Sequence, residues 1–177
     1  SESEMNVILD KIRSSIEDES KKIELVKKIN KEKDIIKQEK MFLAELKKDP
    51  NNHFILNSLA YNQYEQKKYK KGIGFVKKAM KISDGNYLLD TLGLGYFYLK
   101  EFSKSLEMFD ACIKKDIENK KEIGEHYFNR ANTYLEMGRL NESKNDYNKC
   151  IEIKDGFEVS AKLAIDKINK NPLNGKF

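Results

Sequence analysis

Three consecutive segments of the chain repeat one pattern of small and large residues at helical spacing. They begin at His53, Asn86 and Gly124. A small residue follows each start by 7 positions, a second follows after another 19, and two larger residues lie between them. The recurring sets are Ala60, Gly93 and Ala131, then Tyr69, Phe102 and Leu140, then Val76, Phe109 and Tyr147, then Ala79, Cys112 and Cys150. Such repetition restricts the chain to architectures in which like units stack.

The spacing predicts that each unit is a pair of helices of about 12–15 residues joined by a tight turn. We expect these turns at residues 66–68, 100–101 and 137–139. The small residues let the two helices of a unit approach closely, and the larger residues fill the space between units. One helix pair cannot bury its apolar faces alone, so the units are expected to stack into a solenoid.

Composition agrees with an all-α fold. Only 2 Pro and 9 Gly occur in 177 residues, whereas sandwiches and barrels use many turn residues. The charged fraction of 36% requires a large solvated surface. Apolar runs stay well short of the roughly 18 residues of a membrane span, so a membrane role would need an anchor outside this chain or one already removed.

The pattern resembles the tetratricopeptide repeat, a helix-turn-helix unit of 34 residues. Three such repeats cover residues 53–157, and Asp49-Pro50 resembles the end of a degenerate fourth at 19–52. The sequence departs from the family at Gln63, at Gly72 and at the equivalent Ser105 and Ser143. The resemblance implies an all-α, right-handed solenoid with an N-terminal helical extension and a C-terminal capping helix. The other residues at family framework positions are Leu56, Leu59, Leu89, Leu92, Tyr96, Tyr127, Tyr134 and Gly138.

We expect three parts: N-terminal helices at 1–48, three repeats at 49–157, and a capping helix with a short frayed tail at 158–177. Two readings of the first part compete, a degenerate repeat or one long helix over residues 4–47. The regular spacing of apolar residues is lost at Asn30–Lys33, which favours two or more helices. An apolar seam at 3.5-residue spacing, interrupted at Glu19, is formed by Met5, Leu9, Ile12, Ile16, Ile23 and Val26.

The resemblance implies that the first helices of the repeats line a concave groove, which is where we expect a partner protein segment to bind. Many of the implied groove residues are aromatic, at positions that the packing pattern does not require, and aromatic side chains are efficient anchors. The expected function is a non-enzymatic adaptor or scaffold, unless the chain's own terminal helices fill the groove. The groove residues are Phe54, Asn57, Tyr61, Tyr64, Tyr87, Asp90, Leu94, Phe97, Tyr98, Phe128 and Asn132.

Family members that grip the tails of heat-shock chaperones use a clamp of Lys, Arg and Asn. The matching positions here are Asn57, Tyr61, Thr91, Glu125 and Asn129. None of them is basic, and Glu125 would repel a terminal carboxylate. The resemblance therefore argues against that kind of co-chaperone.

A lysine cluster suggests the main alternative to peptide binding in the groove. The net charge is +5, and the excess of basic over acidic residues lies in the middle of the chain. The cluster falls on the turn and the second helix of the first repeat, and the family places that helix on the convex side. This basic patch could dock to nucleic acid, a lipid surface or an acidic protein. Only 3 of the 34 basic residues are arginines, which argues against phosphate recognition and so against nucleic acid. The basic patch consists of Lys67, Lys68, Lys70, Lys71, Lys77 and Lys78.

No pattern in the sequence predicts an enzyme, a cofactor or a metal. His53 and His126 open helices without a partner at ligand spacing, so both are expected at the surface. Cys112 and Cys150 occupy equivalent positions of two units, too far apart for a disulfide, so both are expected to be free and buried. No carboxylate lies in an obviously apolar setting.

Two further expectations concern association and location. Self-association through the N-terminal helices, giving a homodimer, is a third reading of function. The chain starts at Ser1 rather than Met, which is compatible with a cytoplasmic protein or with a processed, envelope-associated product.

Overall fold

The computed structural model describes residues 2–170, and within this range all regular structure is α-helical. The short connections between helices are typical of stacked helical hairpins. None of these helices combines the length and the apolar character that crossing a membrane requires. The helices are α1 (Glu2–Ile29), α2 (Ile35–Lys48), α3 (His53–Glu65), α4 (Tyr69–Ala79), α5 (Asn86–Tyr98), α6 (Phe102–Glu118), α7 (Gly124–Glu136), α8 (Leu140–Ile153) and α9 (Glu158–Lys170).

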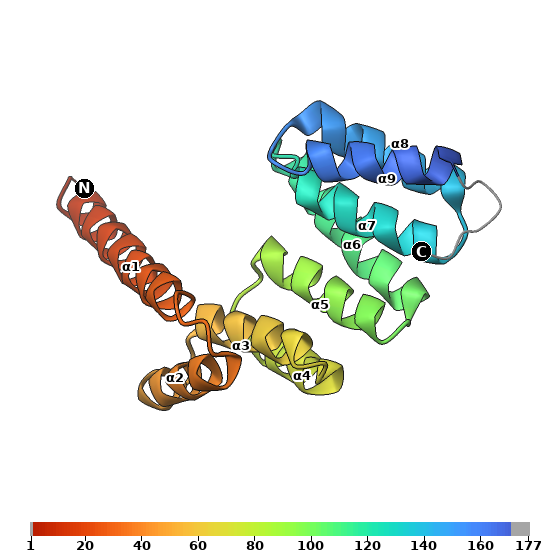
Figure 1. Ribbon diagram of the computed structural model, residues 1–177. Helices are drawn as coiled ribbons and strands as arrows, with labels where there is room; N and C mark the ends of the chain where they lie inside the picture. The colour runs from red at the N-terminus through yellow and green to blue at the C-terminus, as the bar shows by residue number, and fades with distance from the viewer. Residues whose placement is uncertain (1, 171–177) are drawn as a thin grey trace.

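The helices pack in chain order, which gives a solenoid (Figure 1). The pairs α3/α4, α5/α6 and α7/α8 form the tightest contacts, and each pair then packs on the next. The first helices of neighbouring pairs also contact one another, α3 with α5 and α5 with α7. The helix α9 packs on α8 and closes the C-terminal end. The predicted all-α solenoid is therefore confirmed.

The turns inside the pairs have three residues each, at 66–68, 99–101 and 137–139. Two of them fall where the sequence predicted them, and the middle one begins one residue earlier. Each turn holds one residue in the left-handed region, Lys67 and Lys100 at φ 59° and Gly138 at φ 74°. Such a residue reverses the chain tightly at the end of a helix.

Small residues bring the paired helices together as predicted. Ala60 and Ala131 are fully buried, and a Cβ placed on Gly93 would lie 2.7 Å from Cε1 of Phe109. The phenyl ring of Phe109 therefore occupies the volume that a side chain at position 93 would need. The two serines that depart from the family pattern close the same contact, because Ser105 Oγ donates to Gly93 O and Ser143 Oγ to Ala131 O, both at 2.9 Å.

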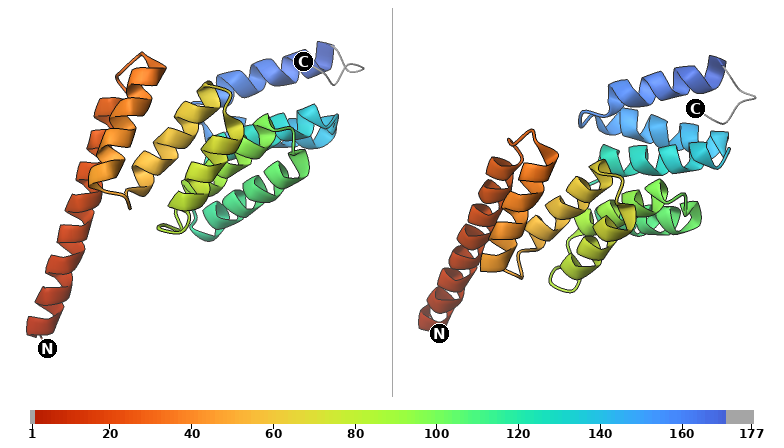
Figure 2. Two further views of the ribbon diagram at one scale, coloured as in Figure 1. Left: turned by 90° about the horizontal axis from the view of Figure 1, so that it is seen from below. Right: turned by 60° about the horizontal axis from the view of Figure 1, so that its bottom comes forward.

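The N-terminal part consists of two helices, so the single helix over residues 4–47 is wrong. Helix α1 ends before the break predicted at Asn30–Lys33, and Asp34 caps α2 by accepting from the backbone N–H groups of Ile36 and Lys37. The end of α1 packs with α2 on α3 around Ile29 and Phe42. The first half of α1 projects away from the stack, as Figure 2 shows from two sides.

Helix α6 has 17 residues, against 11 in the equivalent α4, so it takes up the longer spacing between Gly93 and Ala131, which is 38 positions against 33 between Ala60 and Gly93. The capping helix α9 buries Ala161 and Ile168, while Val159 and Leu163 are exposed. The predicted frayed tail lies largely outside the described residues.

Candidate functional site

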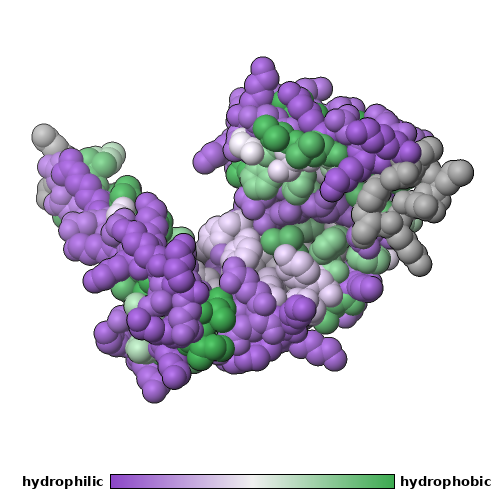
Figure 3. Space-filling model, in the orientation of Figure 1, coloured by the Kyte–Doolittle hydropathy of each residue, from purple (hydrophilic) through white to green (hydrophobic). Residues whose placement is uncertain are grey.

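The first helices of the repeats, α3, α5 and α7, carry the predicted groove residues. Figure 3 shows the molecule hollowed between the projecting α1 and the end formed by α7–α9, with a pale floor between purple rims. Tyr61 and Tyr98 are the most open of the predicted aromatic residues, at 38% and 42% exposed. The half-buried members are Phe54, Asn57, Tyr87, Leu94, Phe97, Phe128 and Asn132.

Four aromatic rings form a continuous run across the boundary between the first two repeats. The ring centroids of Tyr61 and Tyr64 lie 6.2 Å apart, those of Tyr64 and Tyr98 5.7 Å, and those of Tyr98 and Phe97 5.8 Å. Aromatic pairs at these separations attract one another. Burial raises the pKa of both Tyr61 and Tyr98, so both phenols are neutral at physiological pH.

Tyr64 is not a groove surface residue, contrary to the sequence-based expectation. Its side chain is buried, and its hydroxyl donates to Thr91 O at 3.1 Å. Its ring lies so close to Gly72 that a Cβ there would approach Tyr64 Cε1 to 2.3 Å. Because Gly72 replaces the alanine that the family prefers, the ring turns inward and supports Tyr61 and Tyr98 from below.

The groove contains a hollow of about 300 Å³ at its N-terminal end. On its floor the rings of Phe54 and Tyr87 stack with centroids 6.0 Å apart. The side-chain amide oxygen of Asn57, Oδ1, is buried here and accepts no hydrogen bond within the described residues. The end of α1 forms one wall, so it borders the N-terminal hollow without filling it. The lining residues are Ile23, Val26, Lys27, Phe54, Asn57, Ser58 and Tyr87.

A second hollow of about 330 Å³ lies at the C-terminal end of the groove. Phe128 and Asn132 of α7 line it, together with Leu163 and Lys167 of the capping helix. Helix α9 therefore continues the row of first helices. Its exposed Leu163 belongs to the groove and not to the core.

Asp90 is buried and is likewise not on the groove surface. It points into the interface between α5 and α7, where Asn129 Nδ2 donates to Asp90 Oδ1 at 2.9 Å. Burial raises the pKa of Asp90 to about 6. The expectation that no carboxylate lies in an apolar setting is therefore wrong. Asp90 lies on the inner side of a helix whose outer side faces the groove.

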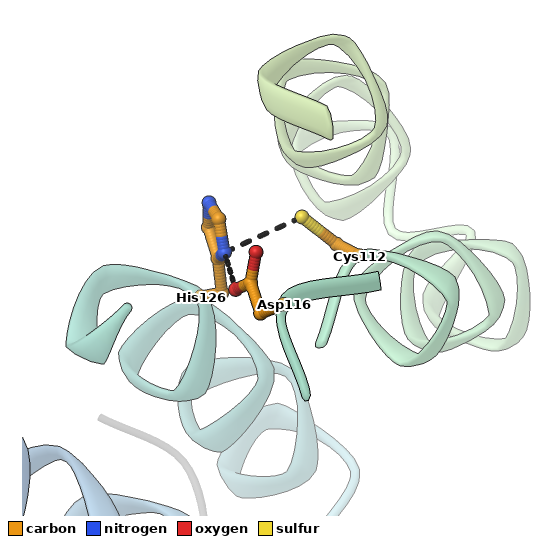
Figure 4. Close-up of side chains that lie close together, drawn as sticks. All are labelled: Cys112, Asp116 and His126. Atoms are coloured by element: carbon orange, nitrogen blue, oxygen red, sulfur yellow. Dashed lines mark hydrogen bonds and ion pairs between the residues drawn. The ribbon is translucent and has the colours of Figure 1, made fainter. Parts of the chain in front are cut away.

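Three reactive side chains meet in the interior between the second and third repeats (Figure 4). His126 Nδ1 donates to Asp116 Oδ2 at 2.6 Å, and Cys112 Sγ lies 3.4 Å from the same nitrogen. All three are buried. His126 was expected at the surface and is not, because its partners come from the preceding helix. The spacing of Cys112 and Asp116, one turn apart on α6, was the available signal.

The two cysteines match the prediction from the sequence, and His53 matches it in part. Cys112 and Cys150 are free and buried, as predicted. His53 is half-buried, and its ring Nδ1 makes a short hydrogen bond with the Tyr87 hydroxyl. Burial lowers the pKa of His53 and raises that of Tyr87 to about 12. Both groups are therefore mostly uncharged at neutral pH.

The six lysines of the basic patch are all exposed. Lys71 is engaged with α2, because its Nζ lies 2.9 Å from Glu39 Oε1. Hydrogen bonds from Gln66 and Lys71 lower the pKa of Glu39 to about 2. Beside the patch, a hollow of about 670 Å³ lies between α2 and the end of α4, with Lys47, Lys78 and Lys81 at its rim. This hollow is larger than either of those in the groove and lies apart from both.

Comparison with known proteins gives one family and one fold. A family model described as "Tetratricopeptide repeat" matches residues 125–156. The Tetratricopeptide repeat and J domain-containing co-chaperone DNJ1 of Fusarium oxysporum f. sp. lycopersici is 36% identical over 58 residues, which are 33% of this chain and 10% of that protein. The chain thus corresponds to a small part of this curated relative.

Two solved structures resemble most of the solenoid. A crystal structure of MamA matches with a TM-score of 0.65 and 21% identity, covering 83% of this chain and 84% of that one. The first TPR of Spaghetti (RPAP3), bound to the HSP90 peptide SRMEEVD, matches with a TM-score of 0.58 and 21% identity, covering 69% and 94%. The third helix pair therefore matches the tetratricopeptide repeat, and the three helix pairs together share the fold of these tetratricopeptide-repeat structures.

Proposed function

We propose that this protein is an adaptor that binds an extended or helical segment of a partner protein in its aromatic groove. Proteins of this family mediate protein–protein interactions. The observation that carries the proposal is the row of solvent-accessible aromatic side chains on α3 and α5, with Tyr61 and Tyr98 exposed. Aromatic side chains that are accessible before binding and lie on a rigid frame are typical anchors of protein interfaces.

Two further features of the groove suit a peptide. The N-terminal hollow offers the stacked rings of Phe54 and Tyr87 for one apolar side chain. The side-chain oxygen Oδ1 of Asn57 beside these rings lacks a donor within the described residues, and a backbone N–H of the partner can supply one. An unsatisfied buried acceptor costs about 1–3 kcal/mol, so its pairing contributes to binding.

The chemistry of the groove selects against an acidic chain terminus. The RPAP3 repeat was solved with such a peptide, whereas the corresponding positions of this chain offer no cation. Thr91 is fully buried, and Asn129 is committed to Asp90. Glu125 adds negative charge on α7. We therefore propose a partner segment with apolar anchors that is neutral or basic.

A peptide library displayed on phage tests this proposal. Peptides selected on the full chain are resynthesised, and their Kd is measured by fluorescence anisotropy. Tyr61→Ala and Tyr98→Ala are each expected to weaken binding about tenfold or more, which corresponds to about 1.4 kcal/mol. Both variants remain folded, because these side chains are already partly in solvent.

The matched control is Lys67→Glu together with Lys70→Glu on the basic patch, neither of which forms an ion pair within the described residues. This double variant is expected to keep the Kd of the selected peptides. Failure to select any peptide would contradict the groove proposal. Loss of binding in the lysine variant alone would move the function to the basic patch, and a steep salt dependence would accompany it.

A second candidate function is self-association through α1. Ile23 and Val26 of the apolar seam face α3 at the N-terminal hollow, and the same seam continues without a partner through Ile16, Ile12 and Met5. The spacing of these residues alternates between 3 and 4, apart from the interruption at Glu19, which is the pattern of a coiled coil. A second copy of this chain carries the identical seam, so we propose it as the occupant of this face.

A further inference from the structure

The interior cluster of Cys112, Asp116 and His126 has no role in the groove, and its chemistry points to a metal ion. Cys112 and Asp116 lie four residues apart on α6, so they share one face of that helix. His126 lies in the first turn of α7, which packs against α6. The extension of α6 is what brings Asp116 to His126. One atom from each side chain lies within 4.8 Å of the other two.

The donor set suits zinc. Thiolate sulfur, imidazole nitrogen and carboxylate oxygen are the ligands of tetrahedral Zn²⁺, at about 2.3, 2.0 and 2.0 Å. In a tetrahedron with such bonds, the ligand atoms lie about 3.3–3.6 Å apart. The Sγ–Nδ1 distance of Cys112 and His126 is already 3.4 Å. The Nδ1–Oδ2 distance between His126 and Asp116, now 2.6 Å, needs to open by about 0.7 Å.

A neighbouring side chain supports the cluster. Asn86 Nδ2 donates to Asp116 Oδ1 at 2.5 Å and to Cys112 O at 2.9 Å. Metal-binding carboxylates are usually held by hydrogen bonds of this kind. The side-chain amide oxygen of Asn86, Oδ1, is buried and accepts no hydrogen bond within residues 2–170. A water molecule can complete the fourth position of a tetrahedral site.

The charge of the interior favours a cation. Asp90 and Asp116 are both buried in this interface, with His126 as the nearest basic group. Burial and the nearby Asp90 and Asp116 raise the pKa of the Cys112 thiol, so without a metal the thiol stays protonated. A divalent ion reverses this situation by binding the thiolate directly.

We propose that Cys112, Asp116 and His126 bind one Zn²⁺ ion that ties the second repeat to the third. Binding takes the thiol proton of Cys112 into solvent. It also requires the unprotonated form of His126 Nδ1, so the proton of a neutral ring moves to Nε2. Zinc then replaces the hydrogen bond between His126 and Asp116 by two metal–ligand bonds, with no change of oxidation state.

The test uses the full chain without an affinity tag, stripped of metal and kept in a non-thiol reductant. Titration with Co²⁺ alone is expected to give a thiolate-to-cobalt charge-transfer band and tetrahedral d–d bands that saturate at one ion per chain. Added Zn²⁺ abolishes both and raises the Tm by several degrees. Because at least one proton is released, the apparent affinity rises about tenfold per pH unit.

The chain supplies its own matched control, because Cys150 is the equivalent buried thiol of the next repeat. Cys112→Ser is expected to lose the charge-transfer band, and Cys150→Ser to keep it. Asp116→Asn and His126→Gln each weaken Co²⁺ binding tenfold or more. Circular dichroism checks that each variant is folded.

Measurements on the wild-type protein test the zinc proposal even if a variant unfolds. Absence of the charge-transfer band together with an unchanged Tm in Zn²⁺ would overturn the proposal, and the cluster would then be a hydrogen-bonded triad only. A band that survives in Cys112→Ser, or one that disappears in Cys150→Ser, would also overturn it. These outcomes are independent of peptide binding in the groove.

Discussion

Among the described residues four lysines hold backbone conformations that glycine adopts more readily, and two of them lie in the turns inside the repeats. Lys67 and Lys100 lie at φ 59° in the turns of the first two repeats, where the third repeat has Gly138. A side chain in the left-handed region costs about 1–2 kcal/mol because Cβ crowds the following carbonyl. Glycine avoids this cost but loses more chain entropy on folding. The net balance at such a turn favours glycine.

We therefore predict that Lys67→Gly and Lys100→Gly each raise the free energy of unfolding by about 0.5–1 kcal/mol. Urea unfolding followed by circular dichroism measures the change. Lys114→Gly is the control, since Lys114 lies inside α6 and glycine there should cost about 1 kcal/mol. Destabilisation by both turn variants would mean that the lysine side chains make contacts that outweigh the strain.

The contact between Gly93 and Phe109 yields a second stability prediction. Gly93→Leu overpacks the middle repeat and should lower the free energy of unfolding by about 1–3 kcal/mol. Phe109→Ala leaves a cavity and should lower it by about 3–5 kcal/mol. Gly74→Ala is the matched control, because a Cβ on Gly74 meets nothing within 4 Å. It should be neutral or stabilising, by up to about 1 kcal/mol. An unchanged urea midpoint in both core variants would contradict the repeat register.

At the scale of helices, spacing in the sequence was sufficient for most of the fold. The turns at 66–68 and 137–139 followed from the period of small residues, because only a short reversal brings Ala60 and Ala79, or Ala131 and Cys150, onto facing helices. The longer spacing before the third repeat is taken up by an extended α6. That extension depends on packing against α7, which spacing alone does not specify.

The errors at the candidate site share one physical cause, contact between different helices. The register placed Tyr64 on the groove side of α3, but the space left by Gly72 of α4 draws its ring inward. Asp90 is held inside by Asn129 of α7. His126 was assigned to the surface because no ligand partner lies on its own helix. These side chains respond to partners about 10 to 40 positions away, which helical periodicity does not encode.

At the scale of the whole molecule, the solenoid separates the two faces for which we propose binding. The groove lies on α3, α5 and α7 and ends at the hollow beside α9. The first half of α1 extends beyond this frame (Figure 2), and its apolar residues are open to solvent. An isolated helix of this length is marginally stable in water. Pairing with a second α1 would stabilise it without covering the groove.

The last prediction concerns this pairing. Met5, Ile12 and Ile16 are 58%, 48% and 61% exposed, although they lie on one seam. Burial of such side chains stabilises a helix pair by roughly 1.5–3 kcal/mol each. Analytical ultracentrifugation of the full chain is therefore expected to show a concentration-dependent species of twice the 20.7 kDa monomer mass. Ile12→Lys with Ile16→Lys should give a monomer with less helix signal, because an unpaired α1 frays.

The control for this experiment is Val159→Lys, a charge placed on an equally exposed apolar residue of α9, which should leave the dimer intact. Peptide binding in the groove should be the same in the monomeric variant, since α1 lines the N-terminal hollow with Ile23, Val26 and Lys27, away from the two substituted residues. A wild-type chain that sediments as a monomer at 100 μM, about a hundred times a micromolar Kd, would rule out self-association of useful strength. We would then expect the exposed seam to bind a different protein. The variant with Ile12→Lys and Ile16→Lys would identify that protein, because it would no longer bind it.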